Sequence, residues 1–119
     1  ALGLVHKADV TVPLVAMTSF IAAVGEVAPE ATVFVYGHLG DGNLHVNIVG
    51  PAADDERPVD AVLRLALAHR GSVSAEHGIG SAKRGWLVRQ RGEEAVEAMR
   101  AIKAALDPSG ILNPGTLLP

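Results

Sequence analysis

The sequence contains no cysteine and few aromatic residues, and both absences exclude classes of function. Without cysteine among its 119 residues, the chain forms no disulfide, offers no thiolate to a metal ion and has no cysteine nucleophile. The aromatic residues are two Phe, one Tyr and one Trp, too few to stack on a series of bases. The formal net charge is −3 and no Lys/Arg cluster is paired with stacking aromatics, so we do not expect nucleic acid as a partner.

Long apolar runs are also missing. The longest uncharged stretch, residues 10–25, includes Pro13 and is shorter than the ~20 apolar residues of a membrane-spanning helix. The N-terminus has no basic segment followed by an apolar block and a cleavage site, so we expect no signal peptide and a cytoplasmic location. Hydrophobic residues make up 49% of the chain, which is long enough for one domain with a core and too short for two of ordinary size.

The order of hydrophobic patterns and turn residues predicts an α+β fold. In chain order, the predicted elements are a strand at 9–12, a helix from Pro13, strands at 31–38 and 44–49, a helix capped by Asp54 that ends before Gly71, an extended piece at 72–74, a helix from Gly78 to about Gln90 and a helix at 93–106. In the last helix, we expect four apolar residues to point inward: Val96, Met99, Ile102 and Leu106. A β-α-β-β-α order followed by helices is typical of α+β proteins.

Two histidines lie on either side of a turn in residues 37–45, Gly-His-Leu-Gly-Asp-Gly-Asn-Leu-His. The pair Asp41-Gly42 favours a two-residue type I′ turn. With that turn, His38 and His45 would be direct cross-strand neighbours with Cβ atoms ~5 Å apart, close enough for both imidazoles to bind one metal ion. The alternative is a solvated hairpin face on which the two histidines share no ligand.

Alternation in these two strands predicts the face on which the histidines lie. An aliphatic set alternates with a polar set, which places the two sets on opposite faces of the sheet. The aliphatic set, which we expect to lie in the core, is Val33, Val35, Val46 and Ile48. The polar set, which we expect to face a ligand or solvent, is Tyr36, His38, His45 and Asn47.

Glu76 and His77 follow the extended piece directly and precede a glycine-rich segment, a position at which functional residues concentrate. His38, His45 and Glu76 would form a set of two histidines and one carboxylate with open coordination positions. Such a set suits Zn, Mn, Co or Fe(II). The alternative is a helix-capping Glu76 beside a surface His77, which spacing alone does not exclude.

Three segments with long motifs occur in a specific order: GHLGDGNLHVN at 37–47, GSVSAEHGIG at 71–80 and LDPSGILNP at 106–114. Together they resemble the C-terminal domain of FAD-linked oxidases. These are flavoenzymes with a vanillyl-alcohol-oxidase-type flavin domain, and their substrates include D-2-hydroxyglutarate, D-lactate and glycolate. The resemblance runs from about Lys7 to the C-terminus, nearly the whole chain.

The resemblance implies a fold and a place in a longer protein. An antiparallel, ferredoxin-like sheet is expected to cap the flavin. Residues 1–119 would be a fragment, the substrate or cap domain, from which the FAD-binding domain and a substrate-contacting arginine upstream of Ala1 are missing. Thr116 stands where many relatives have lysine, which puts a contact between the C-terminal tail and the flavin in question.

The resemblance also implies roles for individual residues. By their positions in the motifs, His38, His45 and Glu76 match the metal ligands of the family and His77 matches its general base. The remaining matches are substrate-binding Lys7 and Asn47 and, in the tail motif, cofactor-binding Asn113.

The implied reaction is oxidation of a D-2-hydroxy acid to the 2-oxo acid, with hydride transfer to FAD and assistance by a divalent metal ion, Zn or Mn. The expected partners are the 2-hydroxy acid, the FAD domain of the same protein and an electron acceptor. Two alternatives stay open: a metal-binding or interaction module with no flavin chemistry, and a flavin enzyme whose metal site is vestigial.

Overall fold

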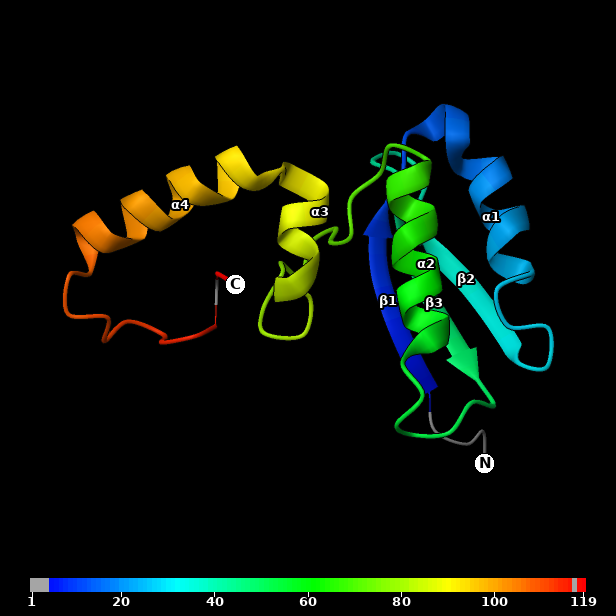
Figure 1. The fold of residues 1–119 in the computed structure, drawn as a ribbon. Helices are drawn as coiled ribbons and strands as arrows, with labels where there is room; N and C mark the ends of the chain where they lie inside the picture. Colours follow the sequence, from blue (N-terminus) through cyan, green and yellow to red (C-terminus); the bar gives the residue numbers. More distant parts are fainter. Residues whose placement is uncertain (1–4, 117) are drawn as a thin grey trace. The chain divides into compact units, whose positions relative to one another are not determined.

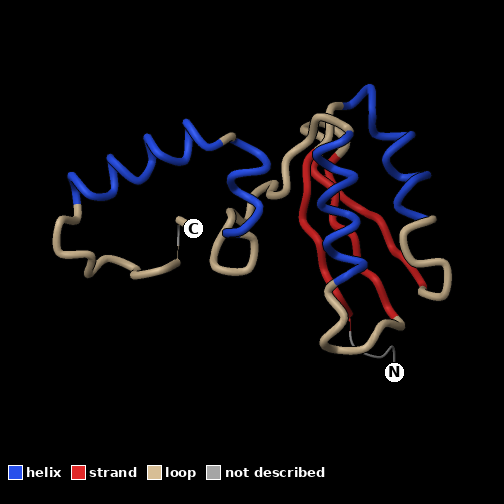
Figure 2. The backbone as a smooth tube through the Cα atoms, in the orientation of Figure 1, coloured by secondary structure: helices blue, strands red, loops and turns tan. Residues whose placement is uncertain are grey.

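The computed structural model of the chain describes residues 5–116 and 118–119. They divide into two compact units between His77 and Gly78, and Figures 1 and 2 trace their backbone. The elements of the first unit are β1 (Val5–Thr11), η1 (Leu14–Ala16), α1 (Met17–Gly25), β2 (Thr32–His38), β3 (Asn43–Val49) and α2 (Arg57–Ala68). Those of the second are η2 (Arg84–Trp86), α3 (Leu87–Arg91) and α4 (Glu93–Leu106). No helix in these described ranges is long and apolar enough to cross a bilayer.

The first unit is an antiparallel three-stranded sheet in the order β1-β3-β2, with α1 and α2 on one face (Figure 1). This arrangement confirms the predicted α+β class and its β-α-β-β-α order. The chain after α2 returns to β1, where Thr11 and Ser72 exchange backbone hydrogen bonds of 3.1 and 2.8 Å. The loop that follows α2 is thereby tied to the end of β1.

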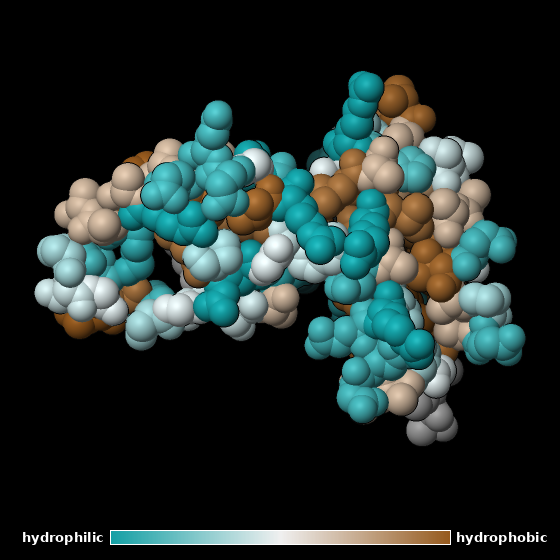
Figure 3. All heavy atoms as spheres, viewed as in Figure 1, coloured by the Kyte–Doolittle hydropathy of each residue, from teal (hydrophilic) through white to brown (hydrophobic). Residues whose placement is uncertain are grey.

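Alternation divides the sheet between a core face and a second face. The core is made of residues from the strands and the two helices: Ala8, Val10, Val12, Leu44, Val46 and Ile48 with Met17, Phe20, Val24, Val62, Leu63 and Ala66. Val33 and Val35 of β2 are half-buried on the same side. The outer side of α2 is largely hydrophilic, and apolar atoms show beside it (Figure 3).

The second face, called here the open face, carries the polar set predicted from alternation. Its residues come from all three strands: Lys7, Asp9 and Thr11 of β1, Asn43, His45 and Asn47 of β3, and Phe34, Tyr36 and His38 of β2. The predicted division of β2 and β3 into an aliphatic and a polar face is therefore confirmed.

The turn between β2 and β3 differs from the predicted one. Its loop has four residues, 39–42, and His38 pairs with Asn43, so the predicted register, in which His38 faces His45, is wrong by two residues. Gly42 has a φ of 73°, whereas Asp41 keeps a negative φ and accepts the Asn43 N–H through Oδ1 at 3.1 Å. Because a shift of two residues preserves side-chain direction, the histidines still share a face.

Two other predicted elements are corrected at their starts. β1 begins at Val5 instead of residue 9, because its alternation continues through Lys7 opposite Asn47. Asp54 does not cap α2. The neighbouring Asp55 accepts the Arg57 N–H and binds the Arg57 guanidinium at 2.7 Å, a hydrogen bond that lowers the pKa of Asp55 to about 2.

In the second unit, α4 spans the predicted residues, but the helix before it is shorter than predicted. Gly78 and Gly80 adopt positive φ values of 74° and 53°, which a helix does not accommodate, and helical structure begins only at Arg84. The predicted inward direction holds for Val96, which is buried, and is wrong for Ile102 and Leu106, which are exposed. The five-residue α3 is too short to cover the C-terminal half of α4.

We predict that Gly42→Ala destabilises the chain by about 2 kcal/mol or more, since left-handed backbone strain in a non-glycine residue alone costs ~1–3 kcal/mol. The added Cβ would also lie 2.1 Å from the Val12 carbonyl oxygen. Gly40→Ala is the matched control in the same loop, because a Cβ there meets nothing within 4 Å and should change stability by less than ~0.5 kcal/mol. Equal urea midpoints for the two variants would contradict this account of the turn.

Candidate functional site

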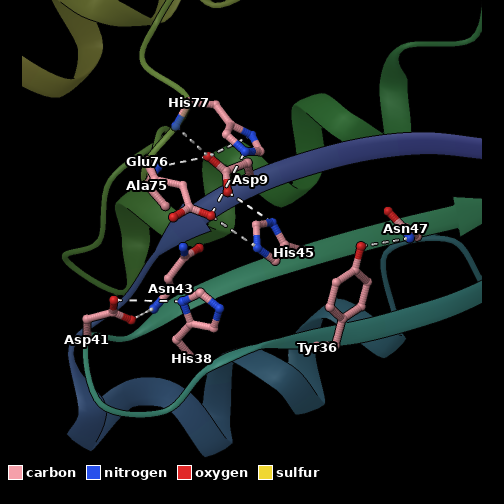
Figure 4. A network of polar contacts seen from close by, with 10 residues as sticks. All are labelled: Asp9, Tyr36, His38, Asp41, Asn43, His45, Asn47, Ala75, Glu76 and His77. Atoms are coloured by element: carbon pink, nitrogen blue, oxygen red, sulfur yellow. Dashed lines mark hydrogen bonds and ion pairs between the residues drawn. The ribbon is translucent and has the colours of Figure 1, made fainter.

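The open face is organised in rows that run across the three strands (Figure 4). Direct cross-strand partners form each row in the order β1, β3, β2: Thr11, Asn43 and His38, then Asp9, His45 and Tyr36, then Lys7, Asn47 and Phe34. The three adjacent rows therefore hold four residues with predicted roles: the metal ligands His38 and His45 and the substrate-binding residues Lys7 and Asn47. The middle row is the one on which the other contacts converge.

In the middle row, a buried carboxylate faces an imidazole. His45 Nδ1 lies 3.1 Å from Asp9 Oδ1, and both side chains are mostly buried. The Tyr36 ring lies tilted against the His45 ring on the other side, with centroids 5.2 Å apart. Held between two neighbours, His45 directs its other nitrogen, Nε2, away from Asp9.

The loop after the Ser72 bridge brings two further side chains to this row. Asp9 Oδ2 accepts hydrogen bonds from the Ala75 and His77 N–H groups at 3.2 and 3.4 Å. Glu76 Oε1 lies 3.6 Å from His45 Nε2 and 3.9 Å from His77 Nε2. The His77 ring stacks on the His45 ring, with centroids 5.8 Å apart. His77 Nδ1 lies 3.6 Å from Asp9 Oδ2.

His38 occupies the adjacent row and is mostly exposed. Its ring meets His45 edge-on with centroids 6.2 Å apart, and its Nδ1 lies 4.0 Å from Asp41 Oδ2. The two histidines are therefore diagonal neighbours on one face, not the directly opposed pair that the type I′ turn predicted. The structure brings His45 and Glu76 into contact and leaves His38 one row away.

The donor set fits a divalent cation. Ligand atoms that share one ion through bonds of ~2.1 Å lie about 3 to 4 Å apart, and the 3.6 Å between His45 Nε2 and Glu76 Oε1 falls in that range. Asp9, Glu76 and His77 also offer three ligand-type atoms within 4.8 Å of one another. Imidazole and carboxylate donors together suit Zn or Mn. The ligand set of His38, His45 and Glu76 stays a prediction.

Asp9 is the site residue that the sequence analysis missed. The signal was present, because Lys7 and Asp9 alternate with buried Ala8 and Val10 and so belong to the polar face. Its partner was not visible, since the sequence does not tell that β1 pairs with β3 or in which register.

The two predicted substrate residues are direct neighbours. Lys7 on β1 pairs with Asn47 on β3, one row from Asp9 and His45. Lys7 is exposed, and Asn47 Nδ2 donates a 3.4 Å hydrogen bond to the Tyr36 hydroxyl. An ammonium and an amide side by side form a suitable receptor for a carboxylate. Their roles in substrate binding stay predictions.

Asn113, the predicted cofactor contact, lies in the second unit. It adopts a φ of 46° and lines a hollow of about 530 Å³ together with apolar residues of α4 and the tail, Met99, Ile102, Leu106 and Leu112. The tail is shaped by Asp107, which accepts the Ile111 and Leu112 N–H groups at 3.0 Å each. A hydrogen bond from Lys103 lowers the pKa of Asp107.

Comparison with known proteins identifies the family. Residues 1–117 match the model of the FAD linked oxidases, C-terminal domain. The chain is 38% identical to D-2-hydroxyglutarate dehydrogenase of Stutzerimonas stutzeri (strain A1501), over 94% of this chain and 27% of that protein. It is 40% and 41% identical to the mitochondrial D-2-hydroxyglutarate dehydrogenases of Arabidopsis thaliana and Bos taurus, over 98% of this chain and 22% of each. The chain thus spans about a quarter of the length of these relatives, and it belongs to the family of FAD-linked oxidases through their C-terminal domain.

Proposed function

We propose that this chain is the substrate-binding part of an FAD-dependent dehydrogenase that oxidises a D-2-hydroxy acid to the 2-oxo acid. The observation that carries the proposal is the open face, where a lysine-amide pair adjoins a cluster of imidazoles and carboxylates. Family membership supports a flavin partner, which we place in a separate FAD-binding domain of the same protein. Among D-2-hydroxyglutarate, D-lactate and glycolate, the names of the relatives favour D-2-hydroxyglutarate.

Substrate recognition rests on two adjacent rows. Residues two apart along a strand are separated by ~6.6 Å, a span that a small hydroxy acid bridges. Lys7 and Asn47 would bind a carboxylate in one row, while the hydroxyl-bearing carbon would lie near His45 in the next. The Tyr36 hydroxyl accepts the amide hydrogen of Asn47 and so orients that amide.

His45 and Glu76, with His38 in the adjacent row, would hold a divalent cation, Zn or Mn. Such an ion, when bound, acts as a Lewis acid that lowers the pKa of a substrate hydroxyl. The protein would orient the ligand side chains, and three of the contacts described above do so without an ion. They are Asp9 to His45, the Asp9 bonds to the loop, and the stacking of His77 on His45.

Oxidation of a 2-hydroxy acid removes a proton from the hydroxyl and a hydride from the α-carbon. His77 would accept the proton, because its side chain is 65% exposed and lies beside Glu76, and a positioned imidazole is the commonest general base in enzymes. The FAD-binding domain would supply the flavin as hydride acceptor, and a separate electron acceptor would reoxidise that flavin. A contact between Asn113 and the cofactor stays a prediction from the family motif.

We expect the chain without an FAD-binding domain to be colourless and inactive toward any 2-hydroxy acid, even with FAD added, because residues for flavin binding would lie mainly in the other domain. Joining the chain to the FAD-binding domain of a relative should give a yellow, active protein. Stoichiometric FAD retained by the 119-residue chain through gel filtration would contradict the proposal.

In the protein that carries the FAD domain, single substitutions separate the roles of the two stacked histidines, His45 and His77. His45→Ala should lose both the metal ion and turnover, because a site left with two ligands binds its ion weakly. His77→Ala should keep about one ion per protein while turnover falls by roughly 10²- to 10⁴-fold, the usual contribution of a positioned base.

The control for both variants is His6→Ala, whose ring contacts the Ala52 carbonyl and lies off the open face, and which should keep metal and activity. Metal analysis alongside kinetics decides the assignment. Loss of the ion in His77→Ala with retention in Glu76→Ala would make His77 the ligand and overturn the role given to Glu76.

A further inference from the structure

We propose that Asp9 is the positioning residue of this site, the group that orients His45 and anchors the loop of Glu76 and His77. Its side chain is only 10% exposed, and its oxygens lie within 3.6 Å of nitrogens of three residues of the site: His45 Nδ1, the Ala75 and His77 backbone nitrogens, and His77 Nδ1. The inference rests on the proposed function in one respect, since it takes His45 and Glu76 as ligands of a divalent cation.

The first effect of Asp9 is on the tautomer of His45. A ring nitrogen 3.1 Å from a carboxylate oxygen is favoured in its protonated form, because a lone pair there would face a negative charge. With the proton on Nδ1, the lone pair of the neutral ring is on Nε2, the atom 3.6 Å from Glu76 Oε1. Metal-binding histidines are commonly oriented in this way by a carboxylate on the other nitrogen.

The second effect is on the loop. Glu76 and His77 belong to no helix or strand, so their backbone needs another anchor. The bonds from Ala75 and His77 N–H to Asp9 Oδ2 flank Glu76 on both sides and hold it beside the sheet. One carboxylate on β1 thus joins a ligand on β3 to a ligand on a loop that is distant in sequence.

The chemistry of the four contacts requires a carboxylate. All four neighbours are nitrogens that can carry hydrogen, and an ionised carboxylate only accepts hydrogen bonds. An amide at this position would direct its NH₂ group at a donor on one side. Asp9 also differs from a ligand in its burial, since its oxygens face protein nitrogens while the Glu76 side chain is 51% exposed.

The test compares Asp9→Asn with Asp60→Asn in the 119-residue chain. Asp60 is a matched control because it loses the same charge on substitution and lies on α2, on the core side of the sheet, where its carboxylate pairs with Arg64 at 3.8 Å. We expect Asp9→Asn to weaken zinc binding by about 10- to 100-fold, the usual effect of removing such a partner, and Asp60→Asn to change it by less than about 3-fold.

Two measurements on the metal-free chain accompany the affinities: the His45 tautomer from ring nitrogen chemical shifts at mildly alkaline pH, and hydrogen exchange of the Ala75 and His77 amides. In the unsubstituted chain we expect the Nδ1–H tautomer and protected amides. In Asp9→Asn we expect a shifted tautomer population and faster exchange, while amides between β1 and β3 stay protected.

Each other outcome overturns the proposal. An Nε2–H tautomer in the unsubstituted chain does so without any variant. Weakened zinc binding with an unchanged tautomer and unchanged exchange would make Asp9 itself a ligand, and unchanged zinc binding would show that its contacts do not serve the ion. If the unsubstituted chain binds no zinc, the metal part of the proposed function fails, and the tautomer and exchange data then decide the role of Asp9 alone.

Discussion

The contact between Asp9 and His45 links the two strands on which the site is built, and the rest of the site depends on it. β1 and β3 pair so that these residues are directly opposed, which places a carboxylate against an imidazole in the middle of a polar sheet face. The same carboxylate accepts the backbone of the loop that carries Glu76 and His77. Packing of α1 and α2 on the other face leaves this face available for a ligand.

Much of this face was predictable from the sequence, because strand alternation is a local property. The aliphatic series of Val46 and Ile48 assigned one side of β3 to the core and therefore assigned His45 and Asn47 to the other. The register was not predictable from turn chemistry. In Asp41-Gly42, the aspartate side chain bonds to the Asn43 amide, and this closes a four-residue loop where two left-handed residues would have closed a shorter one.

The remaining features could not be predicted because they depend on long-range strand pairing and on which element covers a helix. Asp9 was not identified as a site residue because its contact with His45 requires β1 to lie beside β3, and these strands are far apart in sequence. Ile102 and Leu106 were expected to be buried because helical periodicity marks an apolar side but not the element that covers it. The family motifs supplied residue roles that neither periodicity nor spacing could have assigned, including those of Lys7 and Asn113.

A zinc titration of the chain, followed through the ring nitrogens of its five histidines, tests most directly whether the open face is a metal and substrate surface. The account predicts saturable shifts at the two proposed ligands His45 and His38, a smaller effect at His77, and no response from His6 or His69, which bond to the backbone carbonyls of Ala52 and Leu65. An unperturbed His45 in zinc-saturated protein, with the response at His6 or His69, would contradict it.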